Sequence, residues 1–363
     1  MDPERKELIR ELIQSVLPGA ELESASLLPT DRSTPGDDTS KGAGYVRPLR
    51  VRALVGTERR ELVLRLGTAD EFGHDRRSDR AGRALLAFDT ADRIPEHVRI
   101  LDVGLLARGD RLVSLRAYGE PYLLSEFAEG RPYSADLRRI AQAGRALPSD
   151  LERRDTLARY LVRLHAIRES PGSRYRRSVR DLLGHGEGIF GMVDGYPDDV
   201  PAAPPDRLRR IERRCWEWRW RLRGREGRLR RIHGDFHPFN VLFREGTAFT
   251  LVGAARGCAG EAADDVAAMA INFFFFALGS HGSWPEGLRP LWHGFWKLYL
   301  DESGDEELLE VVPPFLAWRG LVLAQPRFYP NVPAREREAL LSFVEAALEA
   351  DRFEPSSADA FFS

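Results

Sequence analysis

The octapeptide His233-Gly-Asp-Phe-His-Pro-Phe-Asn240 restricts the fold of this chain more than any other feature of its sequence. It places an Asp and an Asn five residues apart, in a segment that leads directly into the apolar run Val241-Leu-Phe. A turn around Gly246 and a second apolar run, Phe249 to Val252, follow, and this order is typical of a β-hairpin. Such a combination arises rarely by chance. It predicts a functional loop that is fixed in front of two strands.

This loop resembles the catalytic loop of kinase-like phosphotransferases. In the protein-kinase form, H-R-D-x-x-x-x-N, the Asp accepts the proton of the attacking hydroxyl and the Asn holds a magnesium ion. The H-G-D form, with a second His two residues later, is similar to the aminoglycoside phosphotransferase family, which includes choline and homoserine kinase-like enzymes. The resemblance implies transfer from ATP to a hydroxyl of a small molecule, with Asp235 as the catalytic base and Asn240 as a magnesium ligand.

The sequence departs from that family at one position. There the hairpin ends in Ile-Asp-Phe or a similar tripeptide, whose Asp binds the magnesium ion that bridges the ATP phosphates. Here Gly253 stands at that position, and no acidic residue lies between Gly246 and Gly260. The resemblance therefore implies a weakened magnesium site. Two interpretations stay open: a phosphotransferase with a degraded metal site, and a pseudokinase that binds a nucleotide, a metabolite or a protein.

The resemblance also implies the fold class, which is α+β: a protein-kinase-like fold of two lobes, with an antiparallel sheet and a helix in residues 1–127 and a mostly helical lobe in residues 128–363. The sequence patterns agree with this order. Apolar residues at helical spacing predict a helix over residues 4–16. Alternating patterns predict the N-terminal strands, which are residues 22–28, 47–55, 61–66, 98–106, 111–117 and 122–127. Residues 29–44 are predicted to be a surface loop.

Three residues of the N-terminal half are assigned to cofactor binding by the resemblance. Arg65 points to the face opposite the leucines of its strand, where the family has the cation that pairs with the ATP phosphates. Asp79, on the following helix together with Asp75, is its expected acidic partner. Glu126 belongs to Leu124–Gly130, the expected hinge that meets the adenine. An exposed Arg without a role is the alternative interpretation of Arg65.

The C-terminal half is predicted to be helical. Apolar spacing predicts helices at residues 150–167, 288–300, 306–312, 315–324 and 334–350. His165 is expected to pack inside the first of them. Residues Gly260 to Asp265 resemble the family's start of a large helix, where an acid naturally caps the N-terminus. The aromatic run Phe273 to Phe276 is expected in the core.

The balance of charged residues limits the kinds of binding partner that we expect. Charged residues make up 30% of the chain, yet the formal net charge is -2, which gives no reason to expect nucleic-acid binding. The longest apolar run is too short to span a bilayer and the first residues are charged, so we expect a cytoplasmic protein without a membrane segment. The expected partner is a small-molecule acceptor. Its identity and the oligomeric state are not indicated by the sequence.

A competing interpretation takes His233, Asp235 and His237 as an H-x-D-x-H metal cluster of a hydrolase. Alternate residues of a strand could converge on one ion. Pro238 and the absence of a second cluster of His or Asp residues in the sequence argue against it. His233 is instead expected to hold the loop against the following strand.

Overall fold

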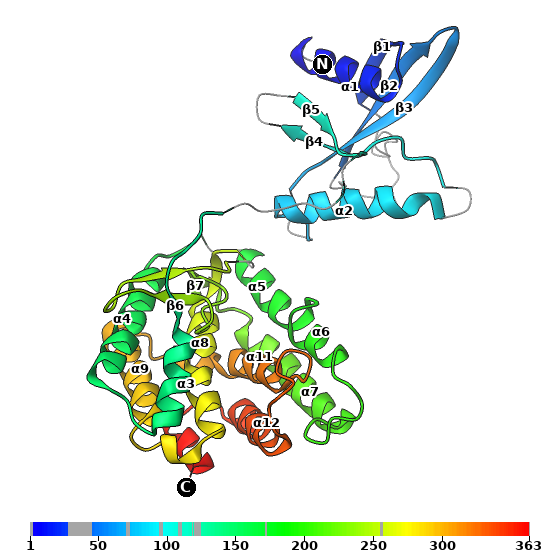
Figure 1. Ribbon diagram of the computed structural model, residues 1–363. Coiled ribbons are helices and arrows are strands. Elements are labelled where there is room, and N and C mark those ends of the chain that lie inside the picture. Colours follow the sequence, from blue (N-terminus) through cyan, green and yellow to red (C-terminus); the bar gives the residue numbers. More distant parts are fainter. Residues whose placement is uncertain are drawn as a thin grey trace. The chain divides into compact units, whose positions relative to one another are not determined.

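The computed structural model describes residues 3–27, 46–69, 73–93, 97–107, 111–117, 119, 125–170, 173–254 and 257–362. The predicted loop at residues 29–44 lies outside them. The chain divides into two compact units, Met1–Leu124 and Ser125–Ser363, and each is described by itself (Figure 1).

The described residues of the first unit form one small hydrophobic core. The elements that form it are a helix and three strands, α1 (Pro3–Val16), β1 (Ala20–Leu27), β2 (Val46–Val55) and β3 (Glu58–Gly67). The strands make an antiparallel sheet in the order β1-β2-β3. Alternate residues of β2, among them Val51, face one side of the sheet, where Ile9 and Ile13 of α1 pack against them. Gly56, with φ of +61°, makes the tight turn between β2 and β3.

The rest of this unit comprises α2 (Arg77–Thr90), the short helix η2 (Ala91–Arg93) and the hairpin of β4 (Gly104–Ala107) and β5 (Arg111–Ser114). The strand predicted from residue 98 is wrong in its first half, because residues 97–103 have no strand partner within the described part of the chain. One backbone hydrogen bond beyond the hairpin of β4 and β5 extends their pairing: Leu115 donates its N–H to Val103 O at 2.7 Å. Of the strand predicted at residues 122–127, the first part lies outside the described residues, and residues 125–127 are not in a strand.

The second unit is mostly helical. Its α-helices are α3 (Tyr133–Ala143), α4 (Pro148–His165), α5 (Ser173–Gly184), α6 (Ile189–Asp194), α7 (Pro205–Leu222), α8 (Ala262–Leu278), α9 (Leu288–Ser303), α10 (Leu308–Val311), α11 (Pro313–Ala324) and α12 (Ala334–Glu349). Three short 3-10 helices of this unit are η3 (Glu226–Arg228), η4 (His281–Ser283) and η5 (Pro355–Phe361). The α+β fold class, with a sheet-containing N-terminal part and a helical C-terminal part, is confirmed.

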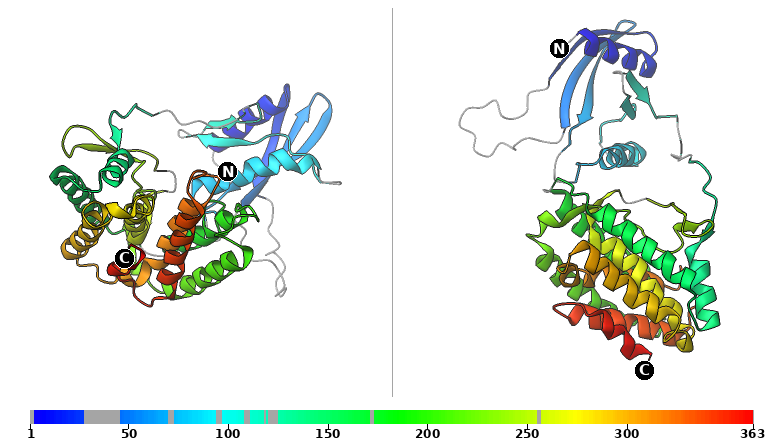
Figure 2. Two further views of the ribbon diagram at one scale, coloured as in Figure 1. Left: turned by 60° about the horizontal axis from the view of Figure 1, so that its bottom comes forward. Right: turned by 90° about the vertical axis from the view of Figure 1, so that its left-hand side faces the viewer.

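Helix α8 forms the centre of the second unit. It is apolar on all sides, and all but a few of its residues are buried, as expected for a helix surrounded by others. Figure 2 shows α8, in yellow, enclosed by the green and orange helices of the same unit. Phe273 and Phe274 are fully buried there, which agrees with the predicted core position of the aromatic run.

Two small sheets carry the loop that contains the octapeptide. One has the order β6-β8-β9 and the other pairs β10 with β7. Their strands are β6 (Arg131–Pro132), β7 (Leu229–Arg231), β8 (Val241–Phe243), β9 (Phe249–Leu251) and β10 (Ala259–Glu261). No helix of the described residues is long and apolar enough to cross a membrane.

Candidate active site

The loop from Ile232 to Asn240 joins β7 to β8, so both of its ends are fixed in small sheets. Ile232 donates its backbone N–H to Cys258 O at 3.0 Å, and Val252 donates its own to Asn240 O at 3.0 Å. Gly234 has φ of +81°, a left-handed conformation that residues with a Cβ adopt only at a cost. Backbone contacts therefore hold the loop at both ends, with glycine where the chain turns sharply.

A buried carboxylate holds the loop from the side of α8. Asp265 accepts the backbone N–H of His233 at 2.7 Å and that of Gly234 at 2.8 Å. His165 lies 3.3 Å from the same carboxylate and 2.8 Å from the Tyr299 hydroxyl. Burial alone would raise the pKa of Asp265, but hydrogen bonds from His165 and the two backbone groups outweigh it and lower the pKa. A charged side chain thus fixes the start of the octapeptide.

The Asp235 carboxylate is held by three neighbouring side chains. Its Oδ1 lies 2.7 Å from Arg319 Nη1, and its Oδ2 lies 3.3 Å from His237 Nε2. Asn240 Nδ2 donates to Asp235 Oδ2 and to its backbone oxygen, at 3.0 Å each. His237 Nδ1 accepts the N–H of Phe239 at 3.2 Å. In neutral His237 the proton therefore sits on Nε2, which donates it to Asp235.

These contacts decide which side chain can accept a proton. Burial would raise the pKa of Asp235, but the hydrogen bond from His237 and the charge of Arg319 hold it below the usual range of an Asp. Asp235 is therefore a carboxylate at neutral pH. Both ring nitrogens of His237 are engaged by hydrogen bonds within the loop, so the geometry favours Asp235 over His237 as a base.

The backbone of Gly253 lies directly beside the side-chain amide of Asn240. Gly253 has φ of +79°, and a Cβ placed on it would lie 2.6 Å from Asn240 Nδ2. The side chain that would carry a second metal ligand at this position therefore has no room while Asn240 keeps its hydrogen bonds to Asp235. The two positions offer one amide oxygen and no carboxylate to a magnesium ion, which prefers several oxygen ligands, so they do not make a complete magnesium site.

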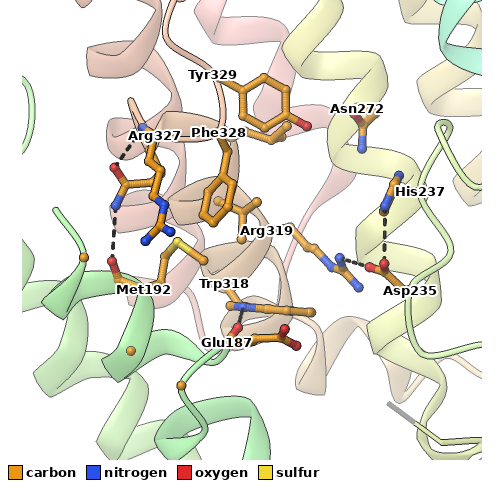
Figure 3. Close-up of a pocket in the computed structure, with 16 residues that line it drawn as sticks. Glu187, Met192, Asp235, His237, Asn272, Trp318, Arg319, Arg327, Phe328 and Tyr329 are labelled. Carbon is orange, nitrogen blue, oxygen red and sulfur yellow. Dashed lines mark hydrogen bonds and ion pairs between the residues drawn. The ribbon is translucent and has the colours of Figure 1, made fainter. Parts of the chain in front are cut away.

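Asp235 and Arg319 line a cavity of about 390 Å³ inside the second unit (Figure 3). Figure 3 shows Arg319 extending from α11 to Asp235, with His237 above the carboxylate. The opposite parts of the wall include apolar side chains, Met192 and Phe328 among them, and the acid Glu187. A small molecule in this cavity would lie next to the Asp235 carboxylate.

The three residues assigned to cofactor binding are each described within their own unit. Arg65 is exposed on β3, on the face opposite the core, and its strand partner is Pro48. Asp79 Oδ2 accepts the backbone N–H of Arg76 at 2.9 Å, which caps the start of α2. Glu126 is exposed in the second unit. Of the predicted site residues, the structure brings Asp235 and Asn240 into contact.

Sequence reasoning missed Arg319 and the role of Asp264. Arg319 Nη2 lies 3.1 Å from Asp264 Oδ1, so one guanidinium bridges the loop and the first turn of α8. A signal for Arg319 was present, because it is the one charged residue in the apolar segment of α11. An acid at the start of α8 was expected to cap the helix. Asp265, in its first turn, accepts hydrogen bonds from the backbone N–H groups of His233 and Gly234 in the loop.

The alternative metal cluster finds no support in the geometry. No group of three or more His, Cys, Asp or Glu side chains among the described residues could hold a metal ion. The ring of His233 is buried and lies edge-on to Phe236, with 5.9 Å between the ring centres. Its Nδ1 accepts the N–H of Asp235 at 3.3 Å. His233 thus contacts the loop itself.

Comparison with known sequences gives one family. A sequence model described as the Phosphotransferase enzyme family matches residues 50–291, which is more than half of the chain. No curated protein matches the sequence.

Several solved structures are similar at low identity. A glucosamine kinase in complex with glucosamine, ADP and inorganic phosphate is 16% identical, with a TM-score of 0.41, over 96% of this chain and 99% of that chain. A Plasmodium vivax ethanolamine kinase is 13% identical, with a TM-score of 0.37, over 90% of this chain and 83% of that chain. An aminoglycoside-3'-phosphotransferase of type VIII is 18% identical, with a TM-score of 0.32, over 95% of this chain and 100% of that chain.

Proposed function

Because the chain belongs to the phosphotransferase enzyme family, we propose that it transfers the terminal phosphoryl group of ATP to a hydroxyl of a small molecule, with Asp235 as the base. The observation that carries this proposal is the Asp235 carboxylate in the wall of the cavity, ionised and fixed by Arg319 and Asn240. The acceptor oxygen forms the new bond to phosphorus, the bond to the leaving ADP oxygen breaks, and the hydroxyl proton passes to Asp235.

The cofactor roles rest on the family resemblance. We assign Asn240 to the metal, Arg65 to the ATP phosphates with Asp79 as its acidic partner, and Glu126 to the segment that meets the adenine. Magnesium, when bound, neutralises phosphate charge during transfer. With glycine at 253, the charged ligand for that ion is missing, and nucleotide binding should depend little on magnesium. Loss of one strong electrostatic contact lowers a rate by about 100- to 1000-fold, which corresponds to roughly 3 to 4 kcal/mol.

A pseudokinase is the second candidate function, and the contact between Gly253 and Asn240 favours it. The Asn240 amide lies where a side chain at position 253 would begin, so a carboxylate could not be added at 253 without moving Asn240. The protein would then bind a nucleotide or metabolite and transfer nothing.

Two measurements on the full-length chain separate these functions. The first is a thermal-shift and calorimetric titration of ATP with and without magnesium, for which we expect weak binding that changes little with the metal. Tight binding that requires magnesium would contradict the weakened metal site.

The second measurement is turnover over a panel of hydroxylated metabolites, aminoglycosides included, for the wild type, Asp235→Asn and the control Asp198→Asn. Asp198 is exposed and does not line the cavity. A base contributes about 100- to 10,000-fold, so Asp235→Asn should lose at least 100-fold while the control keeps its rate. ATP binding without turnover on any compound would favour the pseudokinase. An Asp235→Asn protein with wild-type turnover would remove Asp235 from the mechanism.

A further inference from the structure

Asn272 is a polar side chain in the middle of an apolar helix. After the two acids of its first turn, α8 carries no other polar residue, and Asn272 is only 3% exposed. Its Nδ2 donates to Ala268 O at 2.7 Å, which sets the orientation of the amide group. The same carbonyl also accepts a backbone N–H of the helix, so α8 does not depend on this additional bond.

The amide oxygen of Asn272 lacks a partner. Oδ1 is buried and accepts no hydrogen bond from any residue that the structure describes. Buried polar atoms of folded proteins are nearly always paired, because an unpaired one is destabilising. An apolar side chain of similar size would avoid this loss. Stability alone thus does not explain an Asn at this position.

Asn272 lines the same cavity as Asp235. Figure 3 shows the two side chains on one side of this cavity, together with His237. Other parts of the wall carry the rings of Phe328 and Tyr329, against which the apolar face of a ligand can pack. A volume of about 390 Å³ corresponds to roughly 13 water molecules, at ~30 Å³ each, which suits a molecule of one ring.

Resting on the proposed transfer to a small hydroxyl compound, we propose that Asn272 is a specificity-determining residue of the acceptor cavity. Its Oδ1 accepts a hydrogen bond from a second hydroxyl of the acceptor, while the reacting hydroxyl lies at Asp235. The acceptor is then a neutral compound of about one ring that carries at least two hydroxyl groups. A charged amine suits this place less well, because it would lose its water beside a neutral oxygen in an apolar part of the wall.

The test is a titration of the full-length protein, without ATP, with cyclohexanol and the positional isomers of cyclohexanediol and aminocyclohexanol. The indole N–H signal of Trp318 in nitrogen-15 NMR spectra reports binding, because this group donates to Glu187 O at 2.8 Å in the cavity wall. We expect one of the diols to bind about 2- to 10-fold more tightly than cyclohexanol, which is the contribution of one neutral hydrogen bond. The same diol should bind more tightly than its amino analogue. A wild-type protein that binds none of these compounds, or prefers none of the diols, would overturn the proposal.

Asn272→Leu removes the oxygen and keeps a side chain of similar size. It should abolish the preference for the diol without lowering the melting temperature, because an unpaired buried atom is lost. Tyr133→Phe is the matched control, because the Tyr133 hydroxyl is also buried and unpaired within the described residues but does not line the cavity. This control should keep the preference.

Two results for Asn272→Leu would contradict its role: a folded variant that still prefers the diol, and a variant that melts well below the wild type, since its oxygen would then have a partner in the protein. If the variant does not fold, the series of compounds on the wild type still decides.

The proposed phosphoryl transfer and the role of Asn272 can fail separately. The titration needs neither nucleotide nor turnover, so a protein without transferase activity can still show the preference for the diol. If the protein does phosphorylate the preferred diol, Asn272→Leu should raise KM for it about 2- to 10-fold with little change in kcat. An unchanged KM would remove Asn272 from substrate recognition and leave the role of Asp235 intact.

Discussion

At the scale of single residues, two independent features disfavour a side chain at position 253. The backbone there has φ of +79°, and the Asn240 amide lies where a Cβ would be. Asn240 cannot move aside without losing its two hydrogen bonds to Asp235. The absence of a carboxylate at 253 and the position of Asn240 are therefore coupled.

A pair of alanine variants measures this coupling. Gly246 has φ of +62° with open space around its Cβ position, so Gly246→Ala should cost only the backbone term, about 1 kcal/mol of unfolding free energy. Gly253→Ala should cost more, because it also displaces Asn240. Urea denaturation of both variants gives the two costs, and the side-chain amide signal of Asn240 reports its movement. Equal costs, with an unchanged Asn240 signal, would show that the contact is unimportant.

Gly253→Asp should also displace Asn240, as Gly253→Ala does. We expect a destabilised protein without a large gain in magnesium-dependent ATP affinity, because the new carboxylate displaces the amide that is the other expected ligand. Calorimetry of this variant beside Gly253→Ala tests it. A folded Gly253→Asp protein that binds ATP tightly only with magnesium would show that Asn240 adapts.

The residues of the site differ in how far the sequence could predict them. Asp235 and Asn240 lie in one short loop, so their spacing was enough to bring them together. Arg319 is far away in the sequence and reaches Asp235 only through the packing of α11 against the rest of the unit. The left-handed backbone at Gly253 likewise depends on the hairpin around it.

At the scale of elements, α8 and the octapeptide loop act together through Asp265. This side chain does not cap its own helix, but accepts two N–H groups of the loop and contacts His165 of α4. A helix, a loop and a second helix thus meet at one fully buried carboxylate.

Asp265→Ala should therefore destabilise the protein strongly. Removing one member of a buried charged network typically costs about 3 to 5 kcal/mol, since the remaining polar groups stay buried without partners. Asp301→Ala, at an exposed ion pair with Lys297, serves as the control and should change stability by less than about 0.5 kcal/mol. Urea denaturation at neutral pH measures both, and similar losses for the two variants would refute the role of Asp265.

The same carboxylate predicts a pH dependence. The pKa of Asp265 is lowered in the folded state, where burial is outweighed by the hydrogen bond from His165 and those of the loop. Its contribution is therefore fully present above the unfolded-state pKa of about 3.9 and is lost as the pH falls below it. The stability difference between wild type and Asp265→Ala should shrink below about pH 4. A difference that stays constant down to pH 3 would be incompatible with a lowered pKa.

Helices and strands could be predicted from the sequence where their apolar pattern is long. The amphipathic spacing predicted the bounds of α1, α4 and α12 to within a few residues, because each of these helices has a continuous apolar face. The strands β6, β7 and β10 have only two or three residues, too few for a pattern to show, and they exist because the surrounding helices bring them together. The first half of the strand expected from residue 98 is not formed, although its pattern is long, because residues 97–103 have no strand partner among the described residues.

At the scale of the whole molecule, the two units have separate cores of unequal size. Among the residues that the structure describes, the core of the first unit contains Ile9, Ile13, Ala20, Leu49, Val51 and Ala53 with a few partly buried neighbours, whereas that of the second unit extends over most of its helices. A small core excludes less apolar surface from water, so the first unit should be the less stable one.

Calorimetry of the full-length chain should accordingly resolve two thermal transitions. Ile9→Ala should lower the first and Leu316→Ala the second, because each side chain is buried in one core and each truncation costs about 2 to 5 kcal/mol. One shared transition that both variants lower equally would mean that the units unfold together.

The close approach of positions 253 and 240 also means that the two positions cannot be changed independently. An aspartate at 253 would force the neighbouring amide of Asn240 to move. That amide belongs to the residue that we assign to the metal. A carboxylate introduced at 253 and the amide at 240 would therefore compete for one place, so a single change at 253 should not by itself set two oxygen ligands side by side.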